Sequence, residues 1–283
     1  MQPDSSEIRE NLRQQWSDAA PFWKKWDLKL STQSQAATDL VVEGASLSPG
    51  LHVLDLACGT GQPAISVAQK IAPLGRVIAT DMTPEMIEAT QHNAYSKGIS
   101  NLEAQVADAE HLPFSDAAFD RVTCRFGIMF FPELDKALDE IRRVLKPRGR
   151  ISFLTWGPLD QNPIFSDTMG PFMKVVSVPP PPPDSPTIFR FADASKLKHT
   201  LTQAGFRKVS VIEHTIPWPW PGSPQDGWDA VRELAVPFKK VINAVPPEKL
   251  PGVVEEVLNN LTRFYDGDQV NFTATVNLAT AEN

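Results

Sequence analysis

Apolar positions in the middle of the chain form short runs that alternate with amphipathic stretches. Five runs lie between residues 51 and 156, each too short and too β-branched for a buried helix, and turn or cap residues follow each one. This alternation predicts βαβ units and a parallel sheet. The runs cover residues 51–57, 76–80, 102–107, 119–124 and 150–156.

Two further strands are expected in the second half of the chain. Residues 208–216 have the sequence KVSVIEHTI and follow a predicted helix over residues 195–204, which Gly205 ends. In residues 269–279 every second position from Val270 is apolar, as in a half-buried strand. All seven strands together predict an α/β fold, a doubly wound, seven-stranded Rossmann-like sheet.

The N-terminal residues are predicted to form a helical cover. Apolar residues recur every four positions from Ile8 to Trp16, and a second helix is expected over residues 34–45. Between the two helices we expect an aromatic cluster of Phe22, Trp23 and Trp26.

A glycine-rich turn follows the first strand in VLDLACGTGQPAISVA, residues 53–68. Gly59 and Gly61 can adopt positive φ and let a ligand approach the backbone. The next helix is expected to begin near Gln62 and Pro63, because a first helical turn tolerates the missing N–H of proline. Its N-terminus would suit a carboxylate or a phosphate.

Asp81 ends the second strand, and Thr83 and Pro84 after it are typical of a helix start. A carboxylate at this strand end, beside the glycine turn, is where doubly wound sheets hold the two hydroxyls of a ribose. The alternative is a plain acid at a helix N-terminus. These features fit a dinucleotide and S-adenosylmethionine equally well.

Two more carboxylates separate these ligands. Asp55 lies inside the first strand, where a pyrophosphate gains nothing from it, whereas an aminoacyl ammonium would bind it directly or through water. Asp108, followed by Ala109, ends the third strand and can accept from an adenine amino group. Both favour S-adenosylmethionine.

The chain resembles the class I S-adenosylmethionine-dependent methyltransferases, in the branch of the ubiquinone/menaquinone C-methyltransferases and related small-molecule enzymes. The matching segments, in family order and spacing over about residues 51–156, are LDLACGTGQP, ATDMTPEM, VADAEHLPF, FDRVTCRFGIMFF and LKPRGR. The resemblance implies strand order 3214576 with the last strand antiparallel. It also implies S-adenosyl-L-methionine as the cofactor and methyl transfer to a small molecule.

The resemblance assigns roles to the residues that match its motifs. The N-terminal helices would close over the cofactor. The implied cofactor-binding residues are Asp55, Ala57, Gly59 and Gly61 at the methionine moiety, Asp81 at the ribose hydroxyls, Met82 on the adenine face, Asp108 and Ala109 at the adenine edge, and Arg125 at the start of the loop beneath the sulfonium.

The loop after the fourth strand departs from the family. Quinone C-methyltransferases carry polar or charged residues there, whereas residues 126–131 have the sequence FGIMFF. This loop argues against quinone-ring chemistry and predicts a hydrophobic acceptor pocket. The candidate substrate-binding residues are Trp16, Phe22, Trp23, Phe126 and Met129, with Trp218, Trp220 and Trp228 as further walls that exclude water. Trp16, Phe22 and Trp23 have ordinary core anchoring as their alternative role.

Proline-rich segments interrupt the alternation after residue 157. Pro179–Pro183 is expected to be extended polyproline or loop, and IPWPWPGSP at 216–224 an interruption, with two helices between residues 225 and 264. We interpret these segments as lid insertions. The predicted units are 1–48 (N-terminal helical cover), 49–157 (cofactor-binding core), 158–192 (lid insertion), 193–216 (core continued), 217–268 (helical lid insertion) and 269–283 (last core strand and tail).

No catalytic residue is assigned from the sequence. In-line displacement at a sulfonium gains much of its rate from holding donor and acceptor at near-attack distance. A base is needed only if the acceptor must lose a proton early. His111, after the adenine-binding turn, and His214, expected at the cofactor-side end of the sixth strand, are weak candidates. We expect structural or solvent-facing roles for His52, His92 and His199, and no stronger role for Tyr95 and Tyr265.

Composition narrows the remaining classes. The net charge of −7 argues against nucleic-acid binding by phosphate neutralisation. Cys58 and Cys124 lie in apolar runs without a second ligand at metal-binding spacing, so we expect no metal, free thiols and a reducing compartment. Without a signal-peptide pattern or an 18-residue apolar stretch, a cytoplasmic protein is expected.

Two alternative functions stay open at this point. One is a catalytically silent relative that binds the cofactor or an apolar ligand as a partner protein. The other is an NAD(P)-dependent oxidoreductase on the same sheet, although Asp55 and Asp108 would have no role in it.

Overall fold

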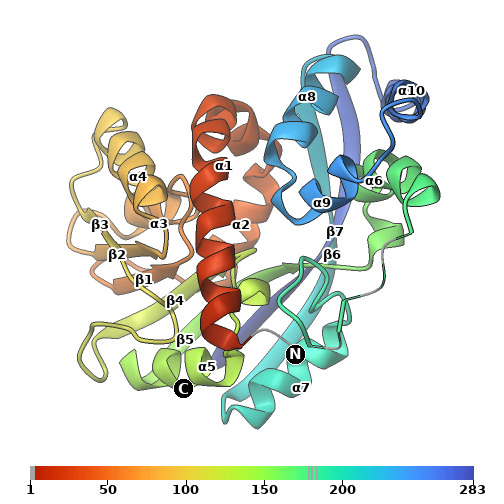
Figure 1. Cartoon of the computed structure of the whole chain (residues 1–283). Coiled ribbons are helices and arrows are strands. Elements are labelled where there is room, and N and C mark those ends of the chain that lie inside the picture. The colour runs from red at the N-terminus through yellow and green to blue at the C-terminus, as the bar shows by residue number, and fades with distance from the viewer. Residues whose placement is uncertain (1–3, 178, 180, 183) are drawn as a thin grey trace.

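One seven-stranded sheet organises the chain in the computed structural model, which describes residues 4–177, 179, 181–182 and 184–283. The strand order is β3-β2-β1-β4-β5-β7-β6 (Figure 1). Only β7 is antiparallel to its neighbours, so the predicted fold class and strand order are confirmed. The strands are β1 His52–Leu56, β2 Arg76–Asp81, β3 Leu102–Val106, β4 Phe119–Arg125, β5 Leu145–Trp156, β6 Arg207–Pro221 and β7 Gln269–Glu282.

Helices pack against the sheet over its whole width (Figure 1). Helices α3 and α4 contact β2 and β3, α2 and α5 contact β5, and α7 contacts β6. Helices α6, α8, α9 and α10 gather around the far ends of β6 and β7. The helices are α1 Ser5–Gln33, α2 Gln35–Gly44, α3 Ala64–Ile71, α4 Pro84–Ser96, α5 Leu134–Val144, α6 Pro163–Val175, α7 Ala194–Gln203, α8 Pro224–Leu234, α9 Lys239–Asn243 and α10 Leu250–Thr262.

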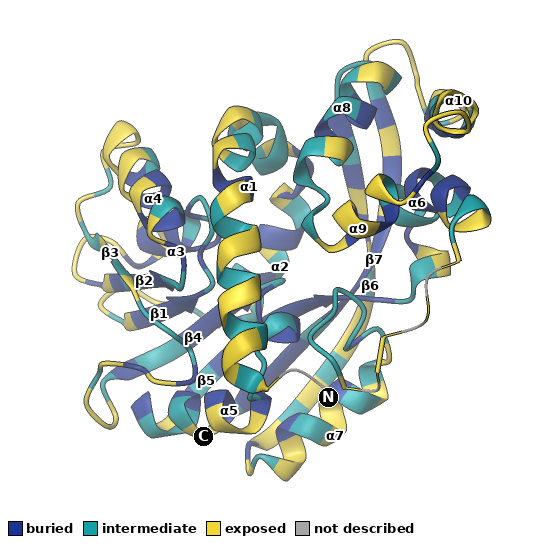
Figure 2. Cartoon of the chain, viewed as in Figure 1, coloured by how far each residue is buried: buried dark blue, intermediate teal, exposed yellow. Residues whose placement is uncertain are grey.

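Helix α1 is longer than the sequence indicated. We expected an aromatic cluster between two helices, but α1 runs unbroken through Phe22, Trp23 and Trp26, with Pro21 inside it. Tertiary packing outweighs the helix-breaking tendency of proline here, because α1 contacts α4 on one side and α8 and β6 on the other. Its outward face is exposed and its inward face covers the carboxyl ends of the strands (Figure 2).

Strand β6 is also longer than predicted. We expected IPWPWPGSP to interrupt the sheet, but β6 continues through Trp218 and Trp220 to Pro221 and pairs with β7 throughout. Alternate residues of an antiparallel strand direct their N–H groups to opposite sides, so Pro217, Pro219 and Pro221 face the free edge and break no ladder bond. The side chains of Trp218 and Trp220 are buried.

The other outcomes concern the late helices and the cysteines. Three α-helices, not two, occupy residues 224–262, because prolines at 237, 246 and 247 divide the predicted pattern. The prediction for Pro179–Pro183 partly falls on Pro180 and Pro183, outside the described residues. Cys58 and Cys124 are free and buried, as predicted. In the described part of the chain we find no helix with both the length and the apolar character needed to cross a bilayer.

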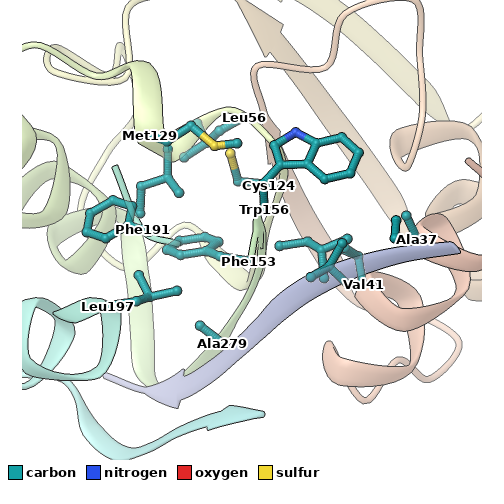
Figure 3. Close-up of a cluster of buried hydrophobic side chains, with 14 of the residues drawn as sticks. Ala37, Val41, Leu56, Cys124, Met129, Phe153, Trp156, Phe191, Leu197 and Ala279 are labelled. Carbon is teal, nitrogen blue, oxygen red and sulfur yellow. The ribbon is translucent and has the colours of Figure 1, made fainter. Parts of the chain in front are cut away.

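The larger hydrophobic core lies around β4, β5 and β7. Figure 3 shows Phe153 and Trp156 of β5 with Leu56, Cys124 and Met129. A smaller cluster lies under α3, between β1 and β2. Both cores fix the carboxyl ends of the central strands, where the functional site lies.

Candidate active site

A cavity of about 300 Å³ opens at the carboxyl ends of β1, β2 and β4, beneath α1. Its lining has two parts of different chemistry. The nucleotide half comprises residues 57–60, 62, 80–82 and 107–110 together with Arg9 and Arg125. The aromatic chamber comprises all lining residues from Phe126 to Phe272. It also includes the lining residues of α1 from Trp16 onward, which face them.

The glycine turn lies in the nucleotide half, as predicted. Gly59 (φ +54°) and Gly61 (φ +115°) have the positive φ that glycine adopts readily, and a Cβ on Gly59 would meet no atom within 4 Å. Ala57 lines the cavity with φ +52°, a strained value for a residue with a side chain. Pro63 is the N-cap of α3, one position before the helical turn in which we predicted it.

Asp81 ties this turn to the next helix. Its Oδ2 accepts from the Gly59 N–H and its Oδ1 from the Thr83 N–H, both at 3.0 Å. Burial raises the pKa of Asp81. Each carboxylate oxygen can accept a second bond, so Asp81 can still receive two ribose hydroxyls. Asp81 therefore lies in the cavity lining, where a ribose ligand is predicted, and also acts as the acid at the start of α4 that was the alternative interpretation.

Helix α4 supports the glycine turn through two residues that our sequence analysis missed. The Thr90 hydroxyl donates to the Gly59 carbonyl at 2.9 Å, and the Asn93 amide donates to the Thr60 carbonyl at 2.8 Å. The two side chains are three positions apart on one helix, and that spacing was the available signal.

Asp55 is fully buried within β1 and is not itself one of the cavity-lining residues. Its Oδ1 accepts from the Thr123 hydroxyl at 2.5 Å, whereas its Oδ2 is buried and has no hydrogen-bond partner among the described residues. Burial raises the pKa of Asp55 to about 7, although the Thr123 hydrogen bond and the charge of Arg125 oppose the shift. A carboxylate in this environment gains strongly from a cationic ligand.

Arg125 ends β4 and holds the helical cover. One guanidinium nitrogen, Nη1, donates to the hydroxyls of Ser34 (2.5 Å) and Thr38 (3.2 Å), where α1 meets α2. Its Nε is buried and has no hydrogen-bond partner in the part of the chain that the structure describes. Burial lowers the pKa of Arg125 to about 10, so the group is still cationic at neutral pH.

Arg9, which we did not predict, holds the N-terminal part of α1 over the nucleotide half. Its Nε lies 3.1 Å from Asp108 Oδ2, and its Nη2 donates to Glu110 and, at 2.9 Å, to Glu133. The Glu110 side chain is 1% exposed. Asp108 and Ala109 line the cavity as predicted, but Asp108 already binds Arg9 with one oxygen and the Glu110 N–H with the other.

We expect Arg9→Met to loosen α1, since it leaves the buried Glu110 carboxylate without its cation. The free energy of unfolding should fall by about 2 kcal/mol, less than for a fully buried pair because Arg9 is 22% exposed. Amide exchange should rise over residues 5–16. Arg13→Met is the matched control, because Arg13 is 36% exposed and pairs with Glu10 on its own helix. Equal exchange in the two variants would contradict this role for Arg9.

The aromatic chamber is built on paired rings. Phe126 and Trp156 stack with centroids 4.3 Å apart and ring planes 9° apart, and the Trp218 ring meets both edge-on. Phe165 meets Trp156 edge-on at 4.8 Å. Phe126 has φ +59° at the end of β4, so this ring projects from a strained position into the cavity lining.

Several predicted residues lie elsewhere. Phe22 is one residue, or about 100°, away from the α1 face that places Trp16 and Trp23 in the lining. Met129, in the 3₁₀ turn Ile128–Phe130, points into the core beside Leu56 and Cys124 (Figure 3) and is fully buried. Trp228 stacks on Phe172 instead, and α8 contributes Gly227 and Ala230 to the chamber in its place.

Other predicted residues have indirect or no contact with the cavity. Asp55 and Gly61 are not among the lining residues. His214 is not at a strand end, because β6 continues for seven further residues, and it does not belong to the lining. The His111 side chain is exposed on the surface beside Lys136. Trp16, Trp23, Ala57, Met82, Phe126, Trp218 and Trp220 line the cavity as expected.

The nucleotide half fits the cofactor that the resemblance implies. Asp55 Oδ2 and Arg125 Nε are buried polar atoms of opposite charge without partners in the described structure. An aminoacyl group, with an ammonium and a carboxylate, would satisfy both. The open space at Gly59 and the spare acceptor capacity of Asp81 suit the rest of an adenosyl ligand.

Comparison with known proteins gives the same family. Residues 47–174 match the family model of a methyltransferase domain. Demethylmenaquinone methyltransferase of Lactobacillus johnsonii is 33% identical over 174 residues, which cover 58% of this chain and 71% of that relative. Ubiquinone/menaquinone biosynthesis C-methyltransferase UbiE of Ralstonia pickettii is 34% identical, over 60% of this chain and 73% of that relative.

A solved structure shares the fold. The crystal structure of the YcgJ protein from Bacillus subtilis superposes with a TM-score of 0.55 and 22% identity, over 88% of this chain and 98% of that one. The chain spans about half the length of the first curated relatives it matches. The two named methyltransferases, in contrast, are covered over more than two thirds of their length. The chain therefore belongs to the class I S-adenosylmethionine-dependent methyltransferases, in the branch of the ubiquinone/menaquinone C-methyltransferases.

Proposed function

We propose that this protein transfers a methyl group from S-adenosylmethionine to an apolar small-molecule acceptor by in-line displacement. One observation carries the proposal: a single cavity joins the nucleotide half, with its carboxylates and glycine turn, to a chamber lined by aromatic rings. A water-excluding apolar chamber of this kind suits a hydrophobic acceptor.

The cofactor supplies an electrophilic methyl group on a sulfonium; the protein supplies position and environment. Asp55 and Arg125 would hold the two charges of the aminoacyl group at the ends of adjacent strands. Asp81 would hold the ribose hydroxyls, and Met82 would pack against the adenine. Gly59 and Ala57 would let the ligand lie close to the backbone.

The acceptor would occupy the aromatic chamber. Phe126 connects the two halves, because it follows Arg125 directly and stacks on Trp156 inside the chamber. Helix α1 would close the site, with Arg9 over the nucleotide half and Trp23 over the chamber. Such closure excludes water and holds donor and acceptor at near-attack distance.

Ligand-dependent unfolding and label transfer test this function. S-adenosylmethionine and S-adenosylhomocysteine at a hundredfold excess over Kd should each raise the free energy of unfolding by about 2.7 kcal/mol, and NADH should not. Incubation with methyl-labelled S-adenosylmethionine and an organic extract of cells should move label into the organic phase. Binding without label transfer would favour the silent partner protein, and stabilisation by NADH alone would favour the oxidoreductase.

A further inference from the structure

The aromatic chamber has no charge of its own, and this restricts the acceptor atom. Resting on the proposed function, we propose that the acceptor is the uncharged nitrogen of an apolar amine. The protein would methylate this nitrogen without a general base and hold the resulting ammonium on the faces of the chamber's aromatic rings.

The first argument is the position of the ionisable side chains. Among the described residues, no histidine, lysine or tyrosine lines the cavity, and the ionisable groups that do are all in the nucleotide half. The carboxylates among them have other partners in the proposed complex: Asp81 has two backbone N–H groups and the ribose hydroxyls, and Asp108 and Glu110 have Arg9. Thr168 brings a hydroxyl to the chamber, but it donates to the Ile164 carbonyl. An acceptor in the chamber therefore finds no group to remove its proton.

The second argument concerns anionic nucleophiles. A phenolate, thiolate or enolate would have to enter the chamber already ionised. No cationic side chain lies in the described lining from Phe126 onward, and Arg125 directs Nη1 to Ser34 and Thr38 at the edge of the helical cover. Burial of an unpaired anion is costly, so these nucleophiles are disfavoured. An amine nitrogen carries its lone pair without a negative charge.

The methyl transfer balances without a further reactant. The nitrogen lone pair forms the new bond to the methyl carbon while the carbon–sulfur bond breaks, and that electron pair returns to sulfur. The positive charge moves from sulfur to nitrogen, so the net charge in the cavity stays the same. A tertiary amine becomes a quaternary ammonium and loses no proton. A secondary amine keeps its proton and can lose it to water after release.

The ring geometry suits the cation that this step creates. Phe126 directly after β4, Trp156 at the end of β5 and Trp218 within β6 contact one another as one cluster of rings, and all three line the cavity. Aromatic faces attract quaternary ammonium groups, most strongly where water is excluded. The buried Trp156 and Trp218 provide such a site. No carboxylate of the described lining lies beside them, and a carboxylate there would bind the ammonium too tightly for release.

Two isosteric probes test the inference by binding alone. Trimethyl(2-naphthylmethyl)ammonium carries the charge, and 2-neopentylnaphthalene is its neutral isostere. With S-adenosylhomocysteine bound, the ammonium should bind on the order of tenfold more tightly than the neutral probe, as measured by tryptophan fluorescence titration. With S-adenosylmethionine bound, the preference should reverse because two cations would share the cavity.

Variants and a turnover assay complete the test. Phe126→Leu should reduce the ammonium preference severalfold, whereas Phe114→Leu, at a ring outside the cavity lining, should not change it. The tertiary amine 2-(dimethylaminomethyl)naphthalene should yield S-adenosylhomocysteine faster than 2-naphthol does. A neutral probe that binds as tightly as the ammonium to the S-adenosylhomocysteine complex, no binding of either probe, or faster turnover of the naphthol would overturn the inference. Failure of the proposed function is distinguishable, because S-adenosylmethionine itself would then not bind.

Discussion

Replacing Asp81 with alanine is expected to weaken the binding of S-adenosylmethionine on the order of a thousandfold. Two charge-assisted hydrogen bonds to the ribose, each worth about 2 kcal/mol, would be lost together. The substitution also removes the acceptor of the Gly59 and Thr83 N–H groups, so the glycine turn loses its connection to α4. Isothermal titration with S-adenosylhomocysteine would measure the loss.

Two further variants make the Asp81 experiment specific. Asp81→Asn keeps the size and one accepting oxygen, so its affinity should lie between those of the wild type and the alanine variant. Asp268→Ala changes an exposed carboxylate near the start of β7 and should bind normally. A Kd for Asp81→Ala within threefold of the wild type would show that the ribose hydroxyls bind elsewhere.

Asp55 is expected to stabilise the ligand complex and to lower the free energy of unfolding of the ligand-free protein at neutral pH. Burial raises the pKa of Asp55 from 3.8 to about 7. Between these values the folded protein keeps a proton that the unfolded chain has lost, so the free energy of unfolding falls as pH rises. This contribution is fully present below pH 3.8 and is lost by about pH 7. It amounts to on the order of 4 kcal/mol.

Asp55→Asn removes this loss because the amide does not titrate, and its oxygen can still accept from Thr123. The free energy of unfolding of the variant minus that of the wild type should therefore increase by on the order of 4 kcal/mol as the pH rises from 4 to 8. Urea unfolding of both proteins at pH 4, 6 and 8 would measure the difference, in which the titration of all other groups cancels. A difference that does not change with pH would contradict a raised pKa for Asp55.

The same substitution should impair cofactor binding. An ionised Asp55 would be the partner of the aminoacyl ammonium, so wild-type affinity should increase with pH up to about pH 7. Asp55→Asn should bind more weakly and lose this pH dependence. If the variant bound S-adenosylhomocysteine as tightly as the wild type at pH 8, Asp55 would have no role in binding.

The parts of the site that the sequence could predict are local to strand ends. The glycine turn, Asp81 and Asp108 each follow a strand whose apolar pattern is visible. In a parallel sheet these carboxyl ends meet at one edge, so the positions converge without further information.

The parts that the sequence could not predict depend on contacts between distant segments. Arg9 lies 101 positions from Glu110 and 124 from Glu133, so no local pattern marks it. Phe22 and Trp23 have the same apolar character, and only the rotation of a continuous α1 decides which one faces the cavity. Met129 and Phe130 are a second such pair: the 3₁₀ turn directs Met129 into the core and Phe130 to the cavity. In each case the packing of an element, not its composition, sets the direction of the side chain.

The alternation of proline and tryptophan at the end of β6 affects how readily molecules of the protein aggregate through the edge of the sheet. β6 is the last strand of the sheet, and an exposed edge of 15 residues is a template for strand addition between molecules. Pro217, Pro219 and Pro221 remove the N–H donors from that edge where β6 and β7 extend beyond β5. The chain can therefore place Trp218 and Trp220 in the lining of the aromatic chamber on a long strand, while that end of the edge resists aggregation.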